Sequence, residues 1–467
     1  MIASALVVVP LVAAILCVSA TRLARPIAVV ASLAVVALAL AALISGAPTS
    51  ASVAWAGPLH AGYSVAADGL TVIFLALGGV LFAIGAAASS RVGHRRAYFA
   101  LWCLLIAAVD GVFVARDLAL FFVFWEAMLI PLAILMWQWG GPDRRGATLR
   151  FLLYTMTGSA FLLAAIAALA ASRGTLDLAE LASRPVAASG QLLPAMLLLA
   201  AFVVKLPLFP FHAWLPRAYV AAPIPVALVL SGIVAKTAVY GIMRLCLGLF
   251  PDGMATAAPV LVALAAVGTL YGALLATRQD DLRRFIAFSS LSHLNLIGLA
   301  LFAATATSLR GAVLASVSHG LVVAALFLLV AMLASRTSSF ALSRAGGLAA
   351  STPVLAAFST LAIVAAIGVP GTSGFAGEFT MLAGTFERFP AAASVATLVV
   401  ILAAMYGLGM LRRAYHGPPL AAGVDLAWRE RLLVIPLLVL VIAVGVVPRV
   451  VSDRIPDDTL PSVEVTR

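Results

Sequence analysis

Residues 205–216 read KLPLFPFHAWLP, and residues 368–379 read GVPGTSGFAGEF. Both stretches place helix-breaking residues inside long apolar segments, and each contains an ionisable residue, Lys205 in the first, which also holds His212, and Glu378 in the second. Proline removes a backbone donor and interrupts or kinks a helix, although membrane helices also tolerate proline and glycine. Broken segments in corresponding positions of two halves indicate a transport site near the bilayer midplane. The two stretches therefore predict a helical membrane protein with two interrupted helices.

The composition also places the chain in lipid. Of its 467 residues, 64% are hydrophobic and 10% are charged, a balance that no water-soluble domain needs. Apolar runs of about 20 residues, the length that spans the hydrocarbon core as a helix, follow one another. These runs are continuous rather than alternating, which favours helices over a β-barrel. We expect about fourteen spans, near residues 2–20, 26–46, 67–89, 98–116, 118–138, 148–171, 192–213, 222–249, 256–277, 284–304, 311–335, 353–386, 391–411 and 432–450.

The predicted fold is thus all-α, and the order of the spans also indicates an internal repeat and an orientation in the membrane. The interrupted segments are the seventh and the twelfth, and an offset of five reverses the chain direction across the membrane, as an inverted repeat requires. Eighteen of the 27 arginines fall in or beside the joints that follow odd-numbered spans. By the positive-inside rule these joints are cytoplasmic and both termini lie outside. This distribution explains the net charge of +11 without a nucleic-acid partner.

Both lysines of the chain, Lys205 and Lys236, lie inside predicted spans, whereas every other basic residue is an arginine. Arginine stays charged in any environment, but a lysine ammonium changes its proton affinity readily when it is desolvated. A site that must gain and lose a proton can therefore use lysine. The alternative is a lysine whose stem lies in lipid while its ammonium reaches the interface, which fits Lys236 poorly because it lies in the middle of its segment.

Five more titratable residues lie within predicted spans, namely Glu126, His212, His293, His319 and Glu378. Ionisable groups inside a membrane are rare unless they face a partner or a hydrated path. One buried histidine is more often a hydrogen-bonded packing residue, but a row of such groups fits proton relay, since histidine titrates near neutral pH. A glutamate paired with a lysine could gate the transfer, because the loss of one charge changes the proton affinity of the other.

Other acidic and metal-binding signals are weaker. We expect Asp110 and Asp117 to be helix caps or loop residues rather than relay members. Metal binding is disfavoured because no HxxH or HExxH spacing occurs, and Cys17, Cys103 and Cys246 stand singly without a CxxC pair. The prediction is therefore that this chain binds no metal and no cofactor and that redox chemistry takes place on another chain.

Several motifs carry a resemblance to a known family: DLALFFVFWEAMLIP, KLPLFPFHAWLP, SGIVAKTAVYGIMR, DDLRRFIAFSSLSHLNLIG, SHGLVVAALF, GVPGTSGFAGEF and RRAYHG. From about residue 100 to residue 416 the chain resembles the proton-conducting, antiporter-like subunits shared by complex I, multisubunit cation/proton antiporters and membrane-bound hydrogenases. The resemblance implies fourteen helices with two inverted five-helix repeats, in which helices 7 and 12 are broken. It divides the chain into 1–97 (helices 1–3), 98–249 (helices 4–8), 250–416 (helices 9–13) and 417–467 (helix 14 and the tail).

The resemblance also implies roles in proton translocation for residues at matching positions. These are Glu126 and Lys205 as the coupled pair of the first half-channel, Lys236 and His293 as links along a central polar axis, His319 beside that axis, and Glu378 as the terminal residue of the second half-channel. Glu378 favours the M-type subunit of NADH-quinone oxidoreductase, since the L- and N-type siblings typically place a lysine there. The end of the chain soon after helix 14 also resembles the M type.

One departure from the family concerns the predicted cytoplasmic entry. Where the family usually reads WLPDAH, residues 214–219 read WLPRAY, so an acid and a histidine are replaced by Arg217 and Tyr219. This difference leaves room for a divergent assembly, such as a hydrogenase-linked complex.

These features together predict a proton-translocating, multi-pass subunit of a bacterial inner membrane. We expect it to couple quinone reduction elsewhere in a complex I-like assembly to proton pumping, with L- and N-type antiporter-like subunits as neighbours. One alternative is a subunit of a multisubunit cation/proton antiporter, although a dedicated sodium site needs additional carboxylates or unwound carbonyls. Another alternative is a scaffold without transport, which the retention of every relay residue disfavours.

Overall fold

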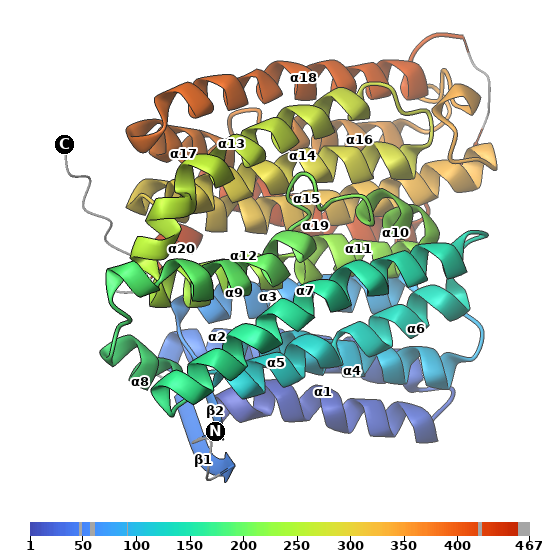
Figure 1. Cartoon of the computed structure of the whole chain (residues 1–467). Coiled ribbons are helices and arrows are strands. Elements are labelled where there is room, and N and C mark those ends of the chain that lie inside the picture. Colours follow the sequence, from blue (N-terminus) through green and yellow to red (C-terminus); the bar gives the residue numbers. More distant parts are fainter. Residues whose placement is uncertain (46–48, 57–60, 91, 419–422, 456–467) are drawn as a thin grey trace.

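The computed structural model describes residues 1–45, 49–56, 61–90, 92–418 and 423–455. It is a bundle of long helices that run roughly parallel to one another, with the N-terminal helices along one side and α18 along the other (Figure 1). The predicted cytoplasmic joint at Arg91 and the tail beyond residue 455 lie outside the described residues.

The first half of the chain supplies the helices at the predicted positions. They are α1 (Ile2–Ser19), α2 (Ala24–Ser45), α3 (Gly69–Ala88), α4 (Arg95–Val114), α5 (Leu118–Ala127), α6 (Leu129–Trp139), α7 (Arg144–Arg173), α8 (Leu178–Ser183), η2 (Ala188–Gly190), α9 (Leu192–Lys205), α10 (Leu215–Ala221), α11 (Ile224–Val229), η3 (Leu230–Val234), α12 (Lys236–Gly241) and η4 (Ile242–Leu247). The eighth predicted span is the continuous run from α11 to η4, in which η3 and η4 are π-helical turns on either side of α12. Such turns are rare and often mark functional sites.

The second half repeats the pattern of long helices and one broken helix. Its elements are α13 (Pro251–Ala276), α14 (Leu282–Ala303), α15 (Ala306–Thr337), η5 (Leu342–Arg344), α16 (Pro353–Ala366), α17 (Ser373–Arg388), α18 (Pro390–Tyr415), α19 (Trp428–Val446) and α20 (Arg449–Ser452). Both predicted interruptions are present, because α9 ends at Lys205 and α16 ends at Ala366. Each break is followed by another helix, α10 or α17.

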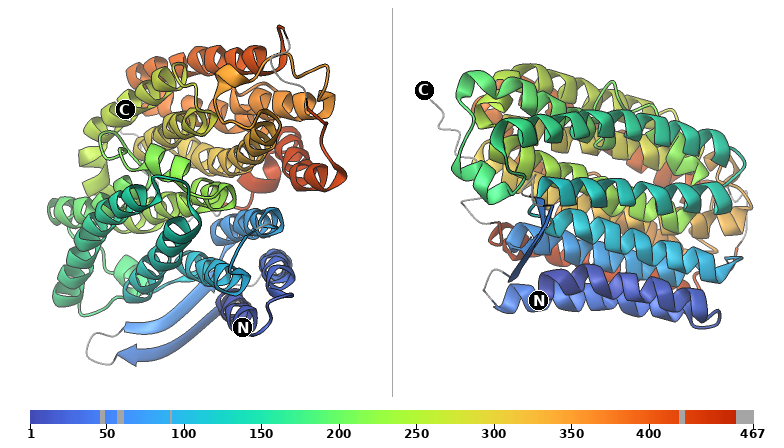
Figure 2. Two further views of the ribbon diagram at one scale, coloured as in Figure 1. Left: turned by 90° about the vertical axis from the view of Figure 1, so that its right-hand side faces the viewer. Right: turned by 60° about the horizontal axis from the view of Figure 1, so that its bottom comes forward.

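Burial separates a central set of helices from a peripheral set. The run from α11 to η4, α14 and α15 are almost wholly buried, whereas α1, α2, α7 and α18 are only partly buried and carry exposed apolar side chains at the surface of the bundle. The end-on view shows this arrangement, with α18 and α1 on opposite sides (Figure 2). A helix that is apolar on every side and buried is expected at the core of a membrane bundle. The predicted relay residues Lys236, His293 and His319 all lie on these central helices.

The all-α prediction is confirmed as the fold class. Eleven helices of the described residues are long and apolar enough to cross a membrane, and α9 and α16 are shorter apolar helices. The count of fourteen spans, the two inverted repeats and the domain limits at 97, 249 and 416 stay predictions. The N-terminus and α20 lie at the same end of the bundle, which agrees with the predicted placement of both chain ends on one side (Figure 1).

A β-hairpin between α2 and α3 is the element that the sequence interpretation missed. It consists of β1 (Thr49–Ala56) and β2 (Ala61–Ala67), paired antiparallel, and it projects from that same end of the bundle (Figures 1 and 2). Its base is joined to the bundle by a hydrogen bond from Arg116 N–H to Ser64 O (2.8 Å) and by burial of Val65. Tyr63, Ser64 and Val65 alternate apolar and polar side chains, the pattern typical of a half-buried strand.

Candidate functional site

Lys236 and His319 form the first contact between predicted relay residues. Lys236 is the first residue of α12, two residues after the last residue of the π-helical turn η3, and its ammonium donates to Ser231 O within that turn (2.8 Å). Its Nζ also lies 2.6 Å from His319 Nδ1, across the interface between α12 and α15. The lysine is fully buried, so these two contacts replace the water that an ammonium would otherwise require. The pair can share or exchange a proton along one short hydrogen bond.

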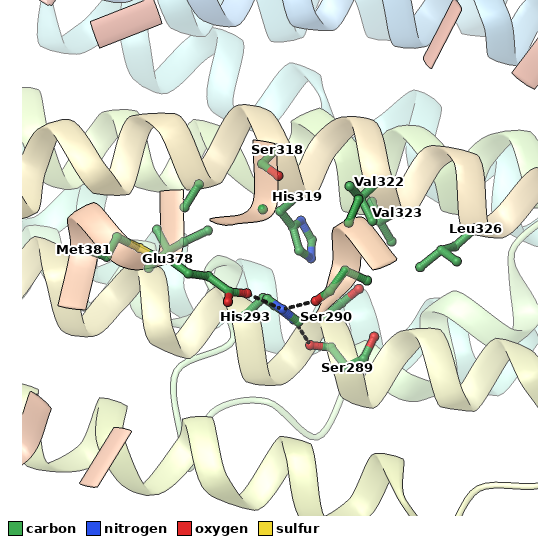
Figure 3. Close-up of a pocket in the computed structure, with 15 residues that line it drawn as sticks. Ser289, Ser290, His293, Ser318, His319, Val322, Val323, Leu326, Glu378 and Met381 are labelled. Carbon is green, nitrogen blue, oxygen red and sulfur yellow. Dashed lines mark hydrogen bonds and ion pairs between the residues drawn. The ribbon is translucent and has the colours of Figure 1, made fainter. Parts of the chain in front are cut away.

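His293 and Glu378 form the second contact. His293 Nε2 lies 3.1 Å from Glu378 Oε1 and 3.1 Å from Ala366 O, while Nδ1 lies 2.8 Å from Ser289 O (Figure 3). Carbonyl oxygens only accept hydrogen bonds, so both ring nitrogens face acceptors, an arrangement that satisfies the imidazolium form. When His293 is protonated, the Glu378 carboxylate lies beside that charge. Gain or loss of a proton by His293 or by Glu378 therefore changes the proton affinity of the other residue.

A cavity of about 30 Å³ lies next to His319, His293 and Glu378, and Lys236 does not line it. His319 and His293 both line it, with ring centroids 6.0 Å apart, and it extends from Glu378 toward Leu326 (Figure 3). Leu326 lies toward the end of α15 that carries Arg336, the predicted cytoplasmic end. The volume is sufficient for water, which needs polar partners in such a space. Lys236, His319, His293 and Glu378 thus meet from four different helices.

Lys205 and Glu126 lie in a separate cluster. The ammonium of Lys205 stacks over the ring of Trp125 (3.7 Å from Nζ to the centroid) and lies 3.4 Å from Met128 Sδ. Glu126 interacts with Lys205 electrostatically, and no direct hydrogen bond joins the two described side chains. The buried Glu126 Oε1 has no hydrogen-bond partner. The charges of the predicted pair therefore influence each other, although the two side chains form no direct hydrogen bond.

The α16–α17 break is what brings Glu378 to His293. Gly368 in the break has a φ of +69°, and a Cβ there would lie 2.4 Å from Glu378 Oε2, so any larger residue would displace the carboxylate. Gly377 lets α17 approach α15 closely, because a Cβ on it would lie 2.7 Å from Ala315 Cα. The glycines of GVPGTSGFAGEF therefore place the titratable group, as the sequence indicated, and the freed Ala366 O accepts from His293.

The α9 break is held by two side chains that the sequence interpretation did not single out. Trp214 donates from Nε1 to Val204 O (2.8 Å), a carbonyl in the last turn of α9. Asn295 accepts from Phe209 N–H (3.0 Å) and donates to Pro207 O (3.1 Å). Backbone groups at membrane depth need such partners because lipid offers none. An amide in the middle of an apolar helix was the available signal for Asn295.

Two other predicted positions lie away from these clusters. His212 stacks against Phe209 and meets Tyr271 edge-on, with ring centroids 5.6 and 5.0 Å apart, and contacts none of the other relay residues in the described structure. At the divergent WLPRAY motif, Tyr219 is buried with its ring near Phe327, whereas Arg217 is exposed and lies 3.9 Å from Asp143. Tyr219 therefore packs into the bundle where the family usually has a histidine.

Asp117 caps a helix as predicted, but the prediction for Asp110 was wrong. Asp117 accepts from the backbone N–H groups of Ala119 and Leu120 at the start of α5. Asp110 instead lies inside α4, fully buried, and neither carboxyl oxygen has a hydrogen-bond partner. Its position near the end of an apolar run looks like a cap in the sequence, but the helix continues for another turn. Such a group costs free energy in either protonation state.

We expect Asp110→Leu to stabilise the protein, because it removes an unsatisfied buried carboxyl and fills similar volume. The gain is on the order of 1–3 kcal/mol, visible as a rise of a few degrees in the apparent melting temperature of the detergent-solubilised complex. Asp110→Asn, which keeps an unsatisfied polar group, is the matched control and should change that temperature little. A Leu variant that melts earlier and loses transport would instead place Asp110 in the relay.

A polar cluster at the hairpin end of the bundle was also missed by the sequence interpretation. Asp68 caps α3 through Thr71 N–H and forms ion pairs with Arg116 and Arg244, and Arg116 donates to the hydroxyl of Tyr240 (2.6 Å). Burial raises the pKa of the Asp68 carboxyl, but the two arginines outweigh this effect and hold that pKa below its usual range. The cluster therefore stays ionised at neutral pH and is lost only in acid.

No group of three or more His, Cys, Asp or Glu residues in the described part of the chain could hold a metal ion. The three cysteines are buried and unpaired by disulfides.

Residues 115–405 match the family model described as NADH:quinone oxidoreductase/Mrp antiporter, transmembrane. The chain belongs to this family. It is 37% identical over 415 residues to NAD(P)H-quinone oxidoreductase chain 4 1 of Synechococcus sp. (strain JA-3-3Ab), covering 85% of this chain and 79% of that protein. It is 36% identical over 419 residues to NADH-quinone oxidoreductase subunit M of Pseudomonas aeruginosa, covering 86% and 82%.

Solved structures extend the similarity to the whole bundle. A chain of respiratory complex I from Thermus thermophilus with bound NADH matches with a TM-score of 0.88 and 30% identity, covering 95% of this chain and 98% of that one. A chain of the Mrp complex from a Dietzia species matches with a TM-score of 0.89 at 24% identity, covering 98% and 97%. The latter likeness shows a shared fold. The predicted resemblance to antiporter-like subunits is confirmed, and the chain is a multi-pass membrane protein of this family.

Proposed function

We propose that this chain is the M-type, proton-translocating subunit of an NADH-quinone oxidoreductase in a bacterial inner membrane. One observation carries the proposal: His319, His293 and Glu378 line one cavity, His293 lies 3.1 Å from Glu378, and His319 is joined to Lys236 by a 2.6 Å contact, so that four titratable side chains from four helices form one connected group. Intramembrane ionisable groups of this kind mark ion pathways. The similarity to curated subunit M and chain 4 proteins over more than four fifths of the chain supports the assignment.

The proposed path begins at the Glu126–Lys205 pair and ends at Glu378. When Lys205 releases a proton, its electrostatic hold on Glu126 is lost, and the neighbouring charges readjust. Lys236 passes a proton to His319 through their short hydrogen bond, and water in the cavity would carry it from His319 Nε2, which has no protein partner, to His293 and Glu378. The residues 98–249 and 250–416 are the two repeats that supply these two half-channels.

The chain supplies the path and another subunit supplies the redox reaction. In this proposal it binds no cofactor, and L- and N-type antiporter-like subunits are its membrane neighbours. The exposed apolar faces of α7 and α18 offer surface for lipid or such neighbours. Quinone reduction elsewhere in the complex changes the charge at one end of this path. Each titratable pair then changes its protonation in response to the charge of the neighbouring pair.

The first test uses inverted membrane vesicles that contain the assembled complex. We expect NADH addition to acidify the vesicle interior in a quinone-dependent manner, at the same rate when sodium is replaced by choline, because the row contains proton-exchanging groups. A rate that collapses without sodium or potassium would replace this proposal with a cation/proton antiporter. Unimpaired acidification in vesicles from a strain lacking this chain would contradict its role in pumping.

A further inference from the structure

Helix α14 contacts both interrupted helices through two side chains. On one side His293 Nε2 approaches Ala366 O at the end of α16 (3.1 Å), and on the other Asn295 binds the backbone that follows α9. Residues two apart on a helix point about 200° apart. Helix α14 therefore lies between the two breaks, and each of its opposite faces forms hydrogen bonds with one of them.

Asn295 uses all of its hydrogen-bonding groups. Its hydrogen bonds to the backbone of the α9 break are called the Asn295 clamp below. The amide nitrogen donates to Pro207 O (3.1 Å) and to Leu291 O within α14 (2.8 Å), and the amide oxygen accepts from Phe209 N–H (3.0 Å). The side chain is fully buried. Its place depends on Gly268 of α13, where a Cβ would lie 2.0 Å from Asn295 Oδ1. A saturated, tightly enclosed amide of this kind fixes the backbone that it binds.

The backbone fixed in this way begins directly after the lysine of the first cluster. Lys205 is the last residue of α9, two residues before Pro207. The position of its ammonium over Trp125 therefore depends on where the break is held. Among the described residues, Glu126 of α5 is the charged group with which Lys205 interacts. A shift of the break changes the Lys205–Glu126 separation and hence the proton affinity of the lysine.

We propose that Asn295 is a positioning residue for proton transfer at Lys205, and that α14 couples this residue to the His293–Glu378 pair. A change of protonation at Glu378 alters the His293 contact on one face of α14, and the Asn295 clamp on the other face carries that change to the α9 break. The two half-channels are thereby linked through one rigid helix in addition to the polar axis. This inference rests on the proposed function, since it assigns a regulator to the same site.

The first test is the pH profile of NADH-driven acidification. Asn295→Ala removes the clamp, and Asn295→Asp keeps the acceptor for Phe209 N–H but loses the donor to Pro207 O. We expect either variant to move the pH of half-maximal rate by about one unit relative to wild type. Ser292→Ala is the matched control: its hydroxyl donates from the same buried helix to Thr269 O (2.7 Å) and touches neither break. It should leave the profile in place.

The second test measures the coupling between Glu378 and the α9 break directly and does not depend on proton transport. Amide hydrogen exchange over residues 206–215 of the purified complex should change in Glu378→Gln relative to wild type, and that change should vanish in an Asn295→Ala background. Variants with unaltered pH profiles and exchange would overturn the proposal, as would failure of both Asn295 variants to assemble, since the clamp would then serve folding alone. A wild-type complex that does not acidify vesicles would instead contradict the proposed function.

Discussion

Membranes that carry Lys205→Ala should lose NADH-driven proton pumping and quinone reductase activity together, each by at least about tenfold. The ammonium of Lys205 lies against Trp125 and Met128 with Glu126 as its charged neighbour, and no other described basic side chain takes its place there. A positioned proton-transfer group typically contributes a factor of about 10²–10⁴. Both activities fall because the redox reaction cannot advance when the coupled protonation step is blocked. Vesicle acidification and quinone reduction measured on the same preparation test this result.

Lys205→Arg separates proton exchange from fixed charge. Arginine keeps a positive charge but does not release its proton at physiological pH, so we expect this variant to be as impaired as Lys205→Ala. Leu193→Ala, at an exposed position of the same helix, is the control for assembly and should behave as wild type. An arginine variant that pumps at the wild-type rate would show that Lys205 serves as a fixed charge. Loss of sodium or potassium exchange alone, with redox turnover intact, would favour the antiporter alternative.

The sequence was sufficient for the features that depend on the residue itself and its near neighbours. Continuous apolar runs predicted where the helices lie, because lipid leaves the backbone no alternative to internal hydrogen bonding. Proline and glycine predicted both breaks, at Lys205 and before Glu378, for the same local reason. The cost of an ionisable group in hydrocarbon singled out the six residues that lie in two clusters, together with His212, which lies away from both.

Features that depend on which helices are neighbours were not predictable in this way. Asn295 gains its meaning only because α14 stands between the two breaks, and a lone amide in an apolar run is otherwise unremarkable. The grouping of Lys236 with His319, and of His293 with Glu378, depends on how α12, α14, α15 and α17 pack. Asp110 was misread because one extra helical turn decides whether a carboxyl near a span end is a cap or is buried.

Glu378→Gln should abolish pumping to a similar extent as Lys205→Ala, because it fills the same space but removes the negative charge from the contact with His293. The glutamine side-chain oxygen can still accept from His293 Nε2–H, now 3.1 Å from Glu378 Oε1, and an amide fits the space beside Gly368. What it lacks is a group that takes up and releases a proton. We therefore expect intact complexes whose acidification rate falls at least about tenfold, measured together with quinone reductase activity.

Two further variants show which property of Glu378 matters. Glu378→Asp keeps the titratable carboxyl but shortens the side chain by one methylene, so its contact with His293 lengthens and pumping should fall only in part. Phe379→Leu changes the adjacent residue, which is exposed at the surface of α17, and should pump normally. A glutamine variant with wild-type acidification would refute titration of Glu378 and leave the carboxylate as a hydrogen-bond acceptor. Partial activity in the aspartate variant and none in the glutamine variant would instead assign proton exchange to this carboxyl. The aspartate keeps the titratable group but changes the side-chain length, whereas the glutamine keeps the length but loses the titratable group.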